Sequence, residues 1–367
     1  MASRSARRGS PEHIDVVISG ASCAGLLAAE KLALGGREVV VLERKGAPRA
    51  PGRTWIVTDR LRSILGELPS DVVLHQTGVM EVNAGDATAS VTLRPPDLII
   101  ERSALLRHLA ARATSAGVEI RVHAEVLGLS FEGDRVALSV RDRNSKRTYQ
   151  IHTRELIGPG GTNCQIASSL SKEPQRVVPV VQAVVDLPAG YDSDVTKVWF
   201  DRAATKYFYW LIPESSRTGV LGLVAETSTN ARGDLDKFLR REGFRALSHQ
   251  GAMIPLHQPT RRLEWSSAGS RVLLVGDAAA HVKVTTVGGV VSGLWGADAA
   301  ARSLLGGTSY RRELRSLHWE LYVHDFIRWS MDRFDQKMYE EMVRMVNEPL
   351  RTFLGDHNRD SMASAAL

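Results

Sequence analysis

The sequence predicts an α/β protein in which a helix-flanked parallel sheet is joined to an antiparallel sheet and a C-terminal helical region. Three observations predict this architecture. Residues 14–43 read as strand, small-residue loop, helix and strand. Residues 176–226 contain several strand-like runs with a turn before the last one. A further apolar strand stops at Gly276-Asp277, and a glycine pair then opens a run of small and apolar residues.

The first of these stretches has the order of a Rossmann-like, dinucleotide-binding βαβ unit. A strand runs into the loop "GASCAG", the helix ends at Gly35-Gly36, and the next strand ends at Glu43. In such units the helix N-terminus faces a pyrophosphate, and an acid about 20 residues further on accepts from a ribose hydroxyl. Ser22 replaces the usual middle glycine, and its hydroxyl can itself donate to a phosphate. The residues expected to contact the dinucleotide are Gly20, Ser22, Cys23, Ala24, Gly25, Glu43 and Arg44.

Nicotinamide dehydrogenases and flavoproteins share this unit, so other features must identify the dinucleotide. Arg102 opens an amphipathic helix, and the strand that follows it ends near Val126. The stretch "ELIGPGGTNCQIAS" is another strand that runs into a glycine-rich turn. The strand that ends at Gly276-Asp277 is the third such feature. Together these favour FAD, with Arg102 and Val126 as further contacts.

With these motifs the chain resembles FAD-dependent oxidoreductases of the para-hydroxybenzoate hydroxylase-like class, and within it the geranylgeranyl reductase family most closely. The resemblance runs from about Asp15 to about Leu350. It is carried by "GDAAAHVKVTTVGGVVSGLWGA" and by "YFYWLIP", which resembles the aromatic signature of that family's substrate domain. It implies an extended FAD whose ribityl or pyrophosphate region lies beside Asp277. The flavin ring would lie against the helix that opens at Val287, Gly288 and Gly289, with Gly276 before it.

Two departures weaken a simple prenyl reductase interpretation. The family usually has a cysteine in the segment that here reads "APRAPGRTWIVTDRLRSILG". The turn "GPGGTNC" has Gly160 where the class has an acidic residue. Flavin-dependent halogenases share part of the aromatic signature, but their lysine after the first glycine loop is missing, because Lys45 is too close to that loop.

The chain is expected to divide into a disordered tail, two interleaved domains and a helical cap. The ranges are 1–13 for the tail; 14–60, 96–172 and 266–306 for the FAD-binding domain; 61–95 and 173–265 for the substrate domain; and 307–367 for the helical region.

Aromatic residues gather in the predicted substrate domain, which suits a large apolar or planar substrate. Strand alternation places about half of them in the core instead. The candidate catalytic residues are Tyr207, Tyr209, Trp210 and His281. No metal is expected, because Cys23 and Cys164 lack the spacing of metal ligands.

Composition limits the partners. The net charge of +6 fits arginine spread over a solvated surface, and no basic run with interleaved aromatics indicates nucleic-acid binding. No apolar run reaches the roughly 18 to 20 residues that cross a bilayer, although peripheral membrane contact stays open. The N-terminus lacks the apolar core of a secretory signal, so a cytoplasmic protein is expected.

The leading interpretation is an FAD-dependent oxidoreductase that acts on a hydrophobic small molecule such as an isoprenoid or another natural-product intermediate. NAD(P)H, binding transiently because no second Rossmann fingerprint is present, or a redox partner protein would reduce the flavin. Alternatives are a flavin monooxygenase (hydroxylase or epoxidase) of a secondary-metabolite pathway and a non-redox flavin-dependent cyclase. A nicotinamide dehydrogenase and a non-catalytic nucleotide-binding module are less favoured.

Overall fold

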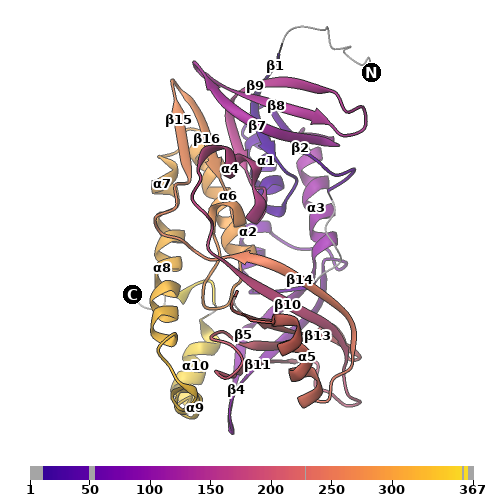
Figure 1. Cartoon of the computed structure of the whole chain (residues 1–367), viewed down its shortest axis with the longest axis vertical. Coiled ribbons are helices and arrows are strands. Elements are labelled where there is room, and N and C mark those ends of the chain that lie inside the picture. Colours follow the sequence, from indigo (N-terminus) through magenta and orange to yellow (C-terminus); the bar gives the residue numbers. More distant parts are fainter. Residues whose placement is uncertain (1–10, 49–53, 228, 358, 363–367) are drawn as a thin grey trace.

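The computed structural model describes residues 11–48, 54–227, 229–357 and 359–362. Within these residues the strands form two eight-stranded sheets. The sheets occupy opposite ends of an elongated molecule, and the C-terminal helices line one side of it (Figure 1). The predicted fold class, with a Rossmann-like domain, a substrate sheet and a C-terminal helical region, is confirmed.

The first sheet carries the parallel strands of the Rossmann-like domain. Its strands, in spatial order, are β15 (Glu264–Ser267), β16 (Ser270–Leu274), β9 (Thr148–Gly158), β1 (Glu12–Ser19), β2 (Val39–Glu43) and β6 (Glu119–Val122), with β8 (Arg135–Asp142) and β7 (Ala124–Glu132) joined beyond β9. Strands β16, β9, β1, β2 and β6 are mutually parallel. Both faces of these strands are covered, which is why they read as continuous apolar runs.

Helices on one face of this sheet form its main core. They are α1 (Cys23–Leu34), α3 (Arg102–Ser115) and α6 (Val290–Leu304). Helix α1 begins where Ser22 caps its N-terminus, and it ends before Gly36, whose positive φ of 84° suits glycine. Strand β1 begins at Glu12, two residues before the expected start. Residues 1–10 of the expected disordered tail lie outside the described residues.

The second sheet forms the other lobe. Its spatial order is β14 (Ala246–Pro255), β10 (Val177–Asp186), β13 (Thr218–Val224), β12 (Tyr209–Pro213), β11 (Val195–Phe200), β4 (Val73–Ala84), β5 (Ala87–Glu101) and β3 (Thr54–Val57). All pairs are antiparallel except β11 with β4. Strand β5 continues to Glu101 and pairs with β3, so residues 54–57 and 96–101 belong to this sheet rather than to the FAD-binding domain.

The remaining helices cover the second sheet and the molecule's side. They are α2 (Arg60–Leu65), α4 (Gln165–Leu170), α5 (Ala231–Arg241), α7 (Tyr310–Glu313), α8 (Arg315–Met331), α9 (Gln336–Arg344) and α10 (Glu348–Asp356), with 3-10 turns η1 (Gly161–Asn163) and η2 (Gly276–Ala279). Helix α5 packs on β10, β12 and β13, whereas α9 packs on β4 and β5. No described helix has both the length and the apolar character needed to span a bilayer.

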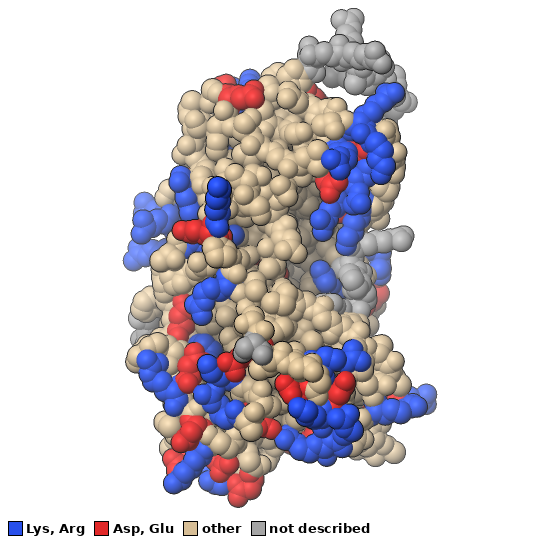
Figure 2. Space-filling model, in the orientation of Figure 1, with Lys and Arg blue, Asp and Glu red and all other residues tan. Residues whose placement is uncertain are grey.

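The charged surface matches the dispersed pattern expected from composition. Figure 2 shows basic and acidic side chains interspersed over the lower part of one face. The same face is hollowed at mid-height, between the two lobes. Both glycine loops identified in the sequence lie on the first sheet, at the ends of β1 and β16 that point toward the second lobe (Figure 1).

Candidate functional site

The first glycine loop is a tight turn between β1 and α1. Gly20 has a positive φ of 129°, which glycine adopts without strain. A Cβ on Gly25 would lie 2.5 Å from the Gly20 carbonyl oxygen and 2.8 Å from the Pro159 ring, so only glycine fits this first turn of α1. Ser22 Oγ accepts a hydrogen bond of 3.2 Å from the Gly25 N–H. The Ser22 hydroxyl hydrogen remains able to donate to an anion.

Glu43 at the end of β2 holds this loop in place. Its two carboxylate oxygens each accept one backbone N–H, from Ala21 and from Lys45, both at 2.9 Å. A carboxylate has about four acceptor positions, so Glu43 can also accept from a ribose hydroxyl. Arg44 follows directly and is exposed. Glu43 therefore holds the loop, and its contact with a ribose hydroxyl stays a prediction.

The second glycine loop follows β16 and contacts the first. Gly276 has a positive φ of 62°, and a Cβ placed on it would lie 3.2 Å from the Cβ of Ala24 in α1. A Cβ on Gly293 in α6 would in turn lie 3.2 Å from Gly276 Cα. Small residues thus bring the beginnings of α1 and α6 together. Two loops that are 250 residues apart in the sequence form one site, as the resemblance implied.

Asp277 lies between this junction and the start of α6. A Cβ on Gly289 would lie 3.1 Å from Asp277 Oδ1, so the carboxyl group is directed at the helix N-terminus. This carboxyl group is surrounded by protein atoms, and its burial raises the pKa of Asp277 to about 6. The positive charge of the nearby Arg102 guanidinium acts in the opposite direction and lowers the pKa. A hydroxyl donor from a ligand would relieve that cost, which fits the expected contact with FAD.

The start of α6 is left open for a ligand. Its N-cap is Gly289, which supplies no side-chain acceptor for the first N–H groups. Lys283 and Gly288 form an isolated β-bridge that closes the preceding loop. Val287, inside that loop, has a φ of 52°, which is strained for a β-branched residue. Strain of this kind is typical of positions whose backbone geometry serves a ligand.

Arg102 is the residue whose surroundings best fit an anionic ligand. Its guanidinium lies over the Trp55 ring at 5.0 Å, and its Nε is buried with no hydrogen-bond partner among the described residues. A buried guanidinium N–H is costly unless an acceptor meets it. The neighbouring Cys23 is a neutral thiol, because burial raises its pKa to about 12. The loops, Arg102 and the open start of α6 therefore fit a phosphate-bearing dinucleotide with a planar ring.

The side chain of Val126 belongs to the core. It is buried in a cluster of the first sheet, among residues such as Leu42 and Val140. The expected contact with FAD therefore falls to the Val126 backbone and stays a prediction. Strand position alone does not indicate which side of the strand a side chain occupies until the neighbouring strand is known.

The aromatic run of the second sheet divides between its two faces. Tyr207, Phe208 and Trp210, together with Val287 of the second glycine loop, pack against a buried cluster that contains Val284 of the same loop. Tyr209 points the opposite way, is buried, and stacks on Phe238 of α5 with ring centroids 3.9 Å apart. The structure therefore keeps Tyr207 and Trp210 beside the candidate flavin ring site. It corrects Tyr209 to a core residue, as strand alternation requires.

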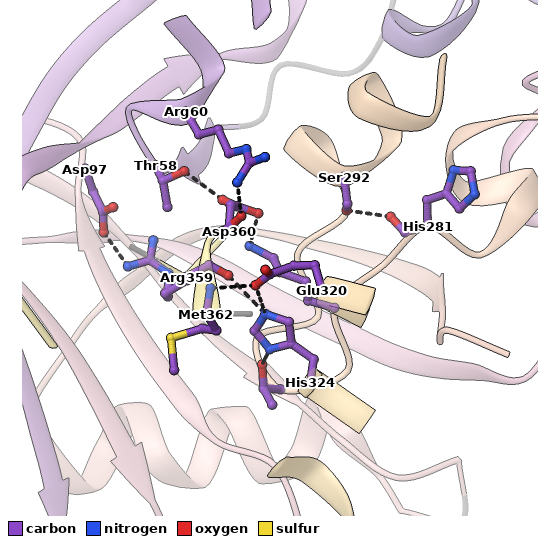
Figure 3. Close-up of polar contacts among 12 residues, drawn as sticks. Thr58, Arg60, Asp97, His281, Ser292, Glu320, His324, Arg359, Asp360 and Met362 are labelled. Atoms are coloured by element: carbon purple, nitrogen blue, oxygen red, sulfur yellow. Dashed lines mark hydrogen bonds and ion pairs between the residues drawn. The ribbon is translucent and has the colours of Figure 1, made fainter. Parts of the chain in front are cut away.

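His281 is also placed away from a substrate. Its ring is fully buried against Gly296, and neither ring nitrogen has a hydrogen-bond partner among the described residues. Burial lowers its pKa well below the usual value, and nearby His318 and His257 add to this effect. Figure 3 shows the ring directed away from the polar side chains gathered around Asp360. His281 is therefore corrected from a catalytic candidate to a neutral packing residue.

A buried polar cluster beside the second loop escaped the sequence analysis. Lys283 Nζ contacts Asp360 Oδ1 at 2.5 Å, and Thr58 Oγ1 donates to Asp360 Oδ2 at 2.7 Å (Figure 3). His324 joins the cluster by binding Thr285 Oγ1 at 2.6 Å. The only local signal was Lys283 beside the glycine pair. Asp360 lies in a polar C-terminal stretch without periodicity, so nothing local indicated its burial.

Comparisons with known proteins agree with this geometry. The FAD binding domain family matches residues 13–304. A digeranylgeranylglycerophospholipid reductase from Methanothermobacter thermautotrophicus is 28% identical over 296 residues, covering 75% of this chain and 74% of that protein. A geranylgeranyl diphosphate reductase from Rhodobacter capsulatus is 25% identical over 317 residues, covering 80% and 76%.

The fold is shared with a solved protein as well. A geranylgeranyl bacteriochlorophyll reductase-like protein from Thermoplasma acidophilum superposes with a TM-score of 0.82 at 16% identity, covering 97% of this chain and 96% of that one. The two glycine loops, the open helix and the aromatic wall thus occur in the fold that the resemblance predicted. The chain belongs to the FAD binding domain family and is an FAD-dependent oxidoreductase that resembles the geranylgeranyl reductases.

Proposed function

We propose that this protein is an FAD-dependent reductase that saturates a carbon–carbon double bond in a hydrophobic, isoprenoid-like small molecule. The observation that carries the proposal is the apolar wall of Tyr207, Phe208 and Trp210, which packs together with Val287 against the buried cluster that contains Val284. An apolar wall of this kind at the candidate ring site suits an aliphatic or planar substrate with few polar groups. The names of the two reductase relatives support the same substrate class.

The two loops divide the work of binding the cofactor. Bound FAD supplies hydride transfer to or from a substrate. The start of α1, Ser22 and Arg102 are placed to hold the pyrophosphate, and Glu43 and Asp277 to accept from hydroxyl groups. The first N–H groups of α6, which follow the N-cap Gly289 and have no side-chain cap, would stabilise negative charge at the ring edge, by up to ~1–2 kcal/mol when partly buried.

Reduction of an alkene also requires a proton at the second carbon, and Tyr207 is the remaining candidate donor. Burial raises the pKa of its hydroxyl, so Tyr207 keeps its proton at neutral pH. The Arg328 guanidinium lies 5.1 Å from the Tyr207 ring and favours negative charge on the oxygen after the proton leaves. Trp210 is not a candidate acid, because its indole N–H donates hydrogen bonds but does not release its proton. Its role is to form part of the apolar wall.

NAD(P)H or a redox partner protein is proposed as the electron source, in a cytoplasmic setting. The test is to purify the protein, record its flavin absorption, and incubate it anaerobically with NADPH and a C20 prenyl alcohol. The expected product carries two more hydrogens per reduced bond in its mass spectrum. In a parallel incubation in air, NADPH consumption that depends on oxygen, with oxygen in the product, would instead establish the monooxygenase. A rearranged product of unchanged mass would establish the non-redox cyclase.

Tyr207→Phe is expected to slow alkene reduction by at least tenfold without changing flavin content, because the donor hydroxyl is lost. Tyr209→Phe is the matched control and should retain its rate, since Tyr209 packs under α5. Anaerobic turnover with the same prenyl alcohol measures both variants. Equal slowing in the two variants would rule out Tyr207 as the donor.

A further inference from the structure

The polar cluster beside the second glycine loop centres on one buried carboxylate. Asp360 is 3% exposed and Lys283 is 6% exposed, and the two lie far apart in the sequence. Lys283 and Thr58 each contact one oxygen of the Asp360 carboxylate, and Arg60 Nη1 donates to the Asp360 backbone carbonyl at 2.5 Å. Donors from two segments, the turn before α2 and the loop before α6, therefore converge on a single residue of the C-terminal segment (Figure 3).

The rest of that segment is also held by polar groups. Arg359 Nη1 donates to Asp97 Oδ2 at 2.7 Å, and the Arg359 carbonyl accepts from His324 Nε2 at 3.0 Å. The Met362 N–H donates to Glu320 Oε1 at 2.7 Å. A buried ion pair adds little to stability compared with apolar packing, and a cluster of buried charged groups in a site is a candidate for function.

The cluster adjoins the candidate flavin site. The Lys283 N–H donates to the Gly288 carbonyl at 3.1 Å, and a Cβ on Gly288 would lie 3.9 Å from Lys283 Nζ. The ammonium group thus lies beside the loop that precedes α6. Any ligand end group bound by Lys283 would lie next to the ring site.

The charges around Asp360 favour an anion at this position. Without its carboxylate, the positive groups of Lys283, Arg60 and Arg359 outnumber the carboxylates of Asp97 and Glu320. Arg359 can stay paired with Asp97 while another anion replaces Asp360. Lys283 and Thr58 would then donate to two oxygens of that anion, as they do now.

We propose that Lys283, Thr58 and Arg60 form an anion-binding subsite beside the flavin site, in which the Asp360 carboxylate stands in for the anionic end group of the substrate. The end group is a carboxylate or a phosphate, since both present two oxygens to the same donors. The hydrophobic chain that carries this end group is taken from the proposed function, and to that extent the proposal rests on it. The C-terminal segment must move aside when such a substrate binds.

The first test titrates the flavin-loaded Asp360→Ala variant with inorganic phosphate and, separately, with acetate by calorimetry. At least one anion should bind tenfold or more tightly to this variant than to the wild type, and the anion that gains identifies the end group. Asp360→Ala combined with Lys283→Met should lose the gain. Asp356→Ala, at an exposed carboxylate of α10, is the control and should bind like the wild type. No gain for either anion would overturn the proposal.

A second test uses the wild type and covers the case in which Asp360→Ala does not fold. Hydrogen–deuterium exchange in residues 359–362 is compared with a C20 prenyl acid, its monophosphate and the alcohol. The acid or the phosphate should increase exchange and the alcohol should not. Unchanged exchange at saturating acid and phosphate would contradict the subsite. Neither test needs turnover, so a protein that binds the anions but reduces no alkene would reject only the reductase.

A separate observation concerns the outer face of α8. Four large side chains, at spacings of three and four residues, lie on one stripe and are strongly exposed: Trp319 by 53%, Tyr322 by 44%, Phe326 by 67% and Trp329 by 55%. Phe326 and Trp329 stack on each other with centroids 5.9 Å apart. Soluble surfaces rarely expose such a contiguous apolar patch unless it meets a partner.

Arginines bound this stripe at both ends. Arg315 precedes it and Arg333 follows it at the same spacing, with the Arg333 guanidinium 3.7 Å from the Trp329 ring centroid. The stripe itself carries no carboxylate. An antiparallel second copy would place Arg315 against Arg333 of that copy, which is unfavourable. Aromatic side chains flanked by arginine are typical of helices that lie in the interface of an anionic bilayer.

We propose that this stripe docks the protein on an anionic lipid surface. Co-sedimentation with phosphatidylcholine vesicles that contain about one third phosphatidylglycerol tests this proposal. Trp319→Ser with Phe326→Ser should weaken partitioning at least tenfold, whereas Leu34→Ser, at an exposed apolar residue of α1, should not. Equal partitioning of both variants, or a wild-type dimer that the double variant abolishes, would refute lipid docking.

Discussion

The N-termini of α1 and α6 both face the candidate FAD site, but they are built differently. Helix α1 begins with a side-chain cap from Ser22, and Glu43 fixes the loop before it. Helix α6 begins at Gly289 without a side-chain cap, after the strained Val287. The first end is complete before any ligand arrives, which suits a pyrophosphate whose charge never changes. The second leaves its N–H groups for a ring whose charge changes with its redox state.

Gly25→Val gives the largest expected effect, because it disrupts the loop and the capped N-terminus of α1. Its Cβ would collide with the Gly20 carbonyl and with Pro159, so the loop must move. We expect FAD affinity to fall at least a hundredfold, which is about 2.7 kcal/mol. Gly128→Ala is the control, since a Cβ there meets nothing within 4 Å. Flavin absorbance after gel filtration measures both, and wild-type retention by Gly25→Val would disprove the steric argument.

Asp277→Asn tests the N-terminus of α6, which has no side-chain cap. FAD should bind about tenfold more weakly, or about 1.4 kcal/mol, because a charged acceptor is lost. The FAD-free protein should nevertheless become more stable at pH 7, since a carboxylate with a raised pKa disfavours the folded state when ionised. Calorimetric melting of both FAD-free proteins and flavin titration provide the measurements.

The same substitution predicts a pH dependence with a definite sign. The folded pKa of Asp277, about 6, exceeds the unfolded value of about 3.9. Between these values the folded state binds more protons, so its stability rises as the pH falls from about 6 to 4. Asp277→Asn should flatten that rise. An unchanged pH profile would show that Asp277 is not the titrating group.

Ser22→Ala should have a smaller effect on the completed end. Loss of the cap costs about 0.5–2 kcal/mol of stability, while Gly20 and Gly25 preserve the loop. FAD affinity should fall by roughly threefold, which is about 0.7 kcal/mol. Thermal melting of the FAD-free protein gives the first quantity and flavin titration the second. Ser22→Thr retains the hydroxyl and should stay close to the wild type in both.

Val287→Gly should have the smallest effect and tests whether strain at the open end matters. Glycine removes the strain of the left-handed backbone at this position, which stabilises the folded state by about 1–2 kcal/mol. The greater freedom of glycine in the unfolded chain offsets about 0.4–1 kcal/mol of that gain. We expect a melting temperature equal to or slightly above that of the wild type, with FAD retained. A clear drop would show that packing of the Val287 side chain outweighs the strain.

Local sequence patterns predicted the N-terminus of α1 and its loop well, but the N-terminus of α6 and its surroundings only in outline. The order from β1 to Glu43 depends on contacts within a short segment, so turn glycines and apolar runs sufficed, apart from the two-residue shift at Glu12. Tyr209 was misassigned, and the burial of the Val126 side chain was not foreseen, because the side a strand residue faces depends on partner strands elsewhere in the chain. His281 was misassigned because closeness in sequence to Gly276 says nothing about direction.

The residues that complete the second end could not be found from local patterns. Asp360 meets Lys283 only after the whole chain has folded around both, and its own surroundings in the sequence are polar and irregular. The extent of β5 is similar: its last residues belong to the second sheet because β3 pairs with them. Long-range pairings of this kind leave no periodic trace.

The parallel pairing of β16 with β9 has a consequence for biosynthesis. Strand β9 leaves the ribosome with β1 already beside it, but its other neighbour follows only after the entire second lobe has been translated. At about 5–20 residues per second, the part of that edge formed by residues 155–158 waits several seconds or more for β16, whereas β8 already pairs with residues 148–153. The part of the second lobe from β10 to β14 is in effect an insertion that delays completion of the first sheet, since β3, β4 and β5 precede β9. Because both glycine loops contribute to the candidate FAD site, this topology places cofactor capture after α6 has emerged.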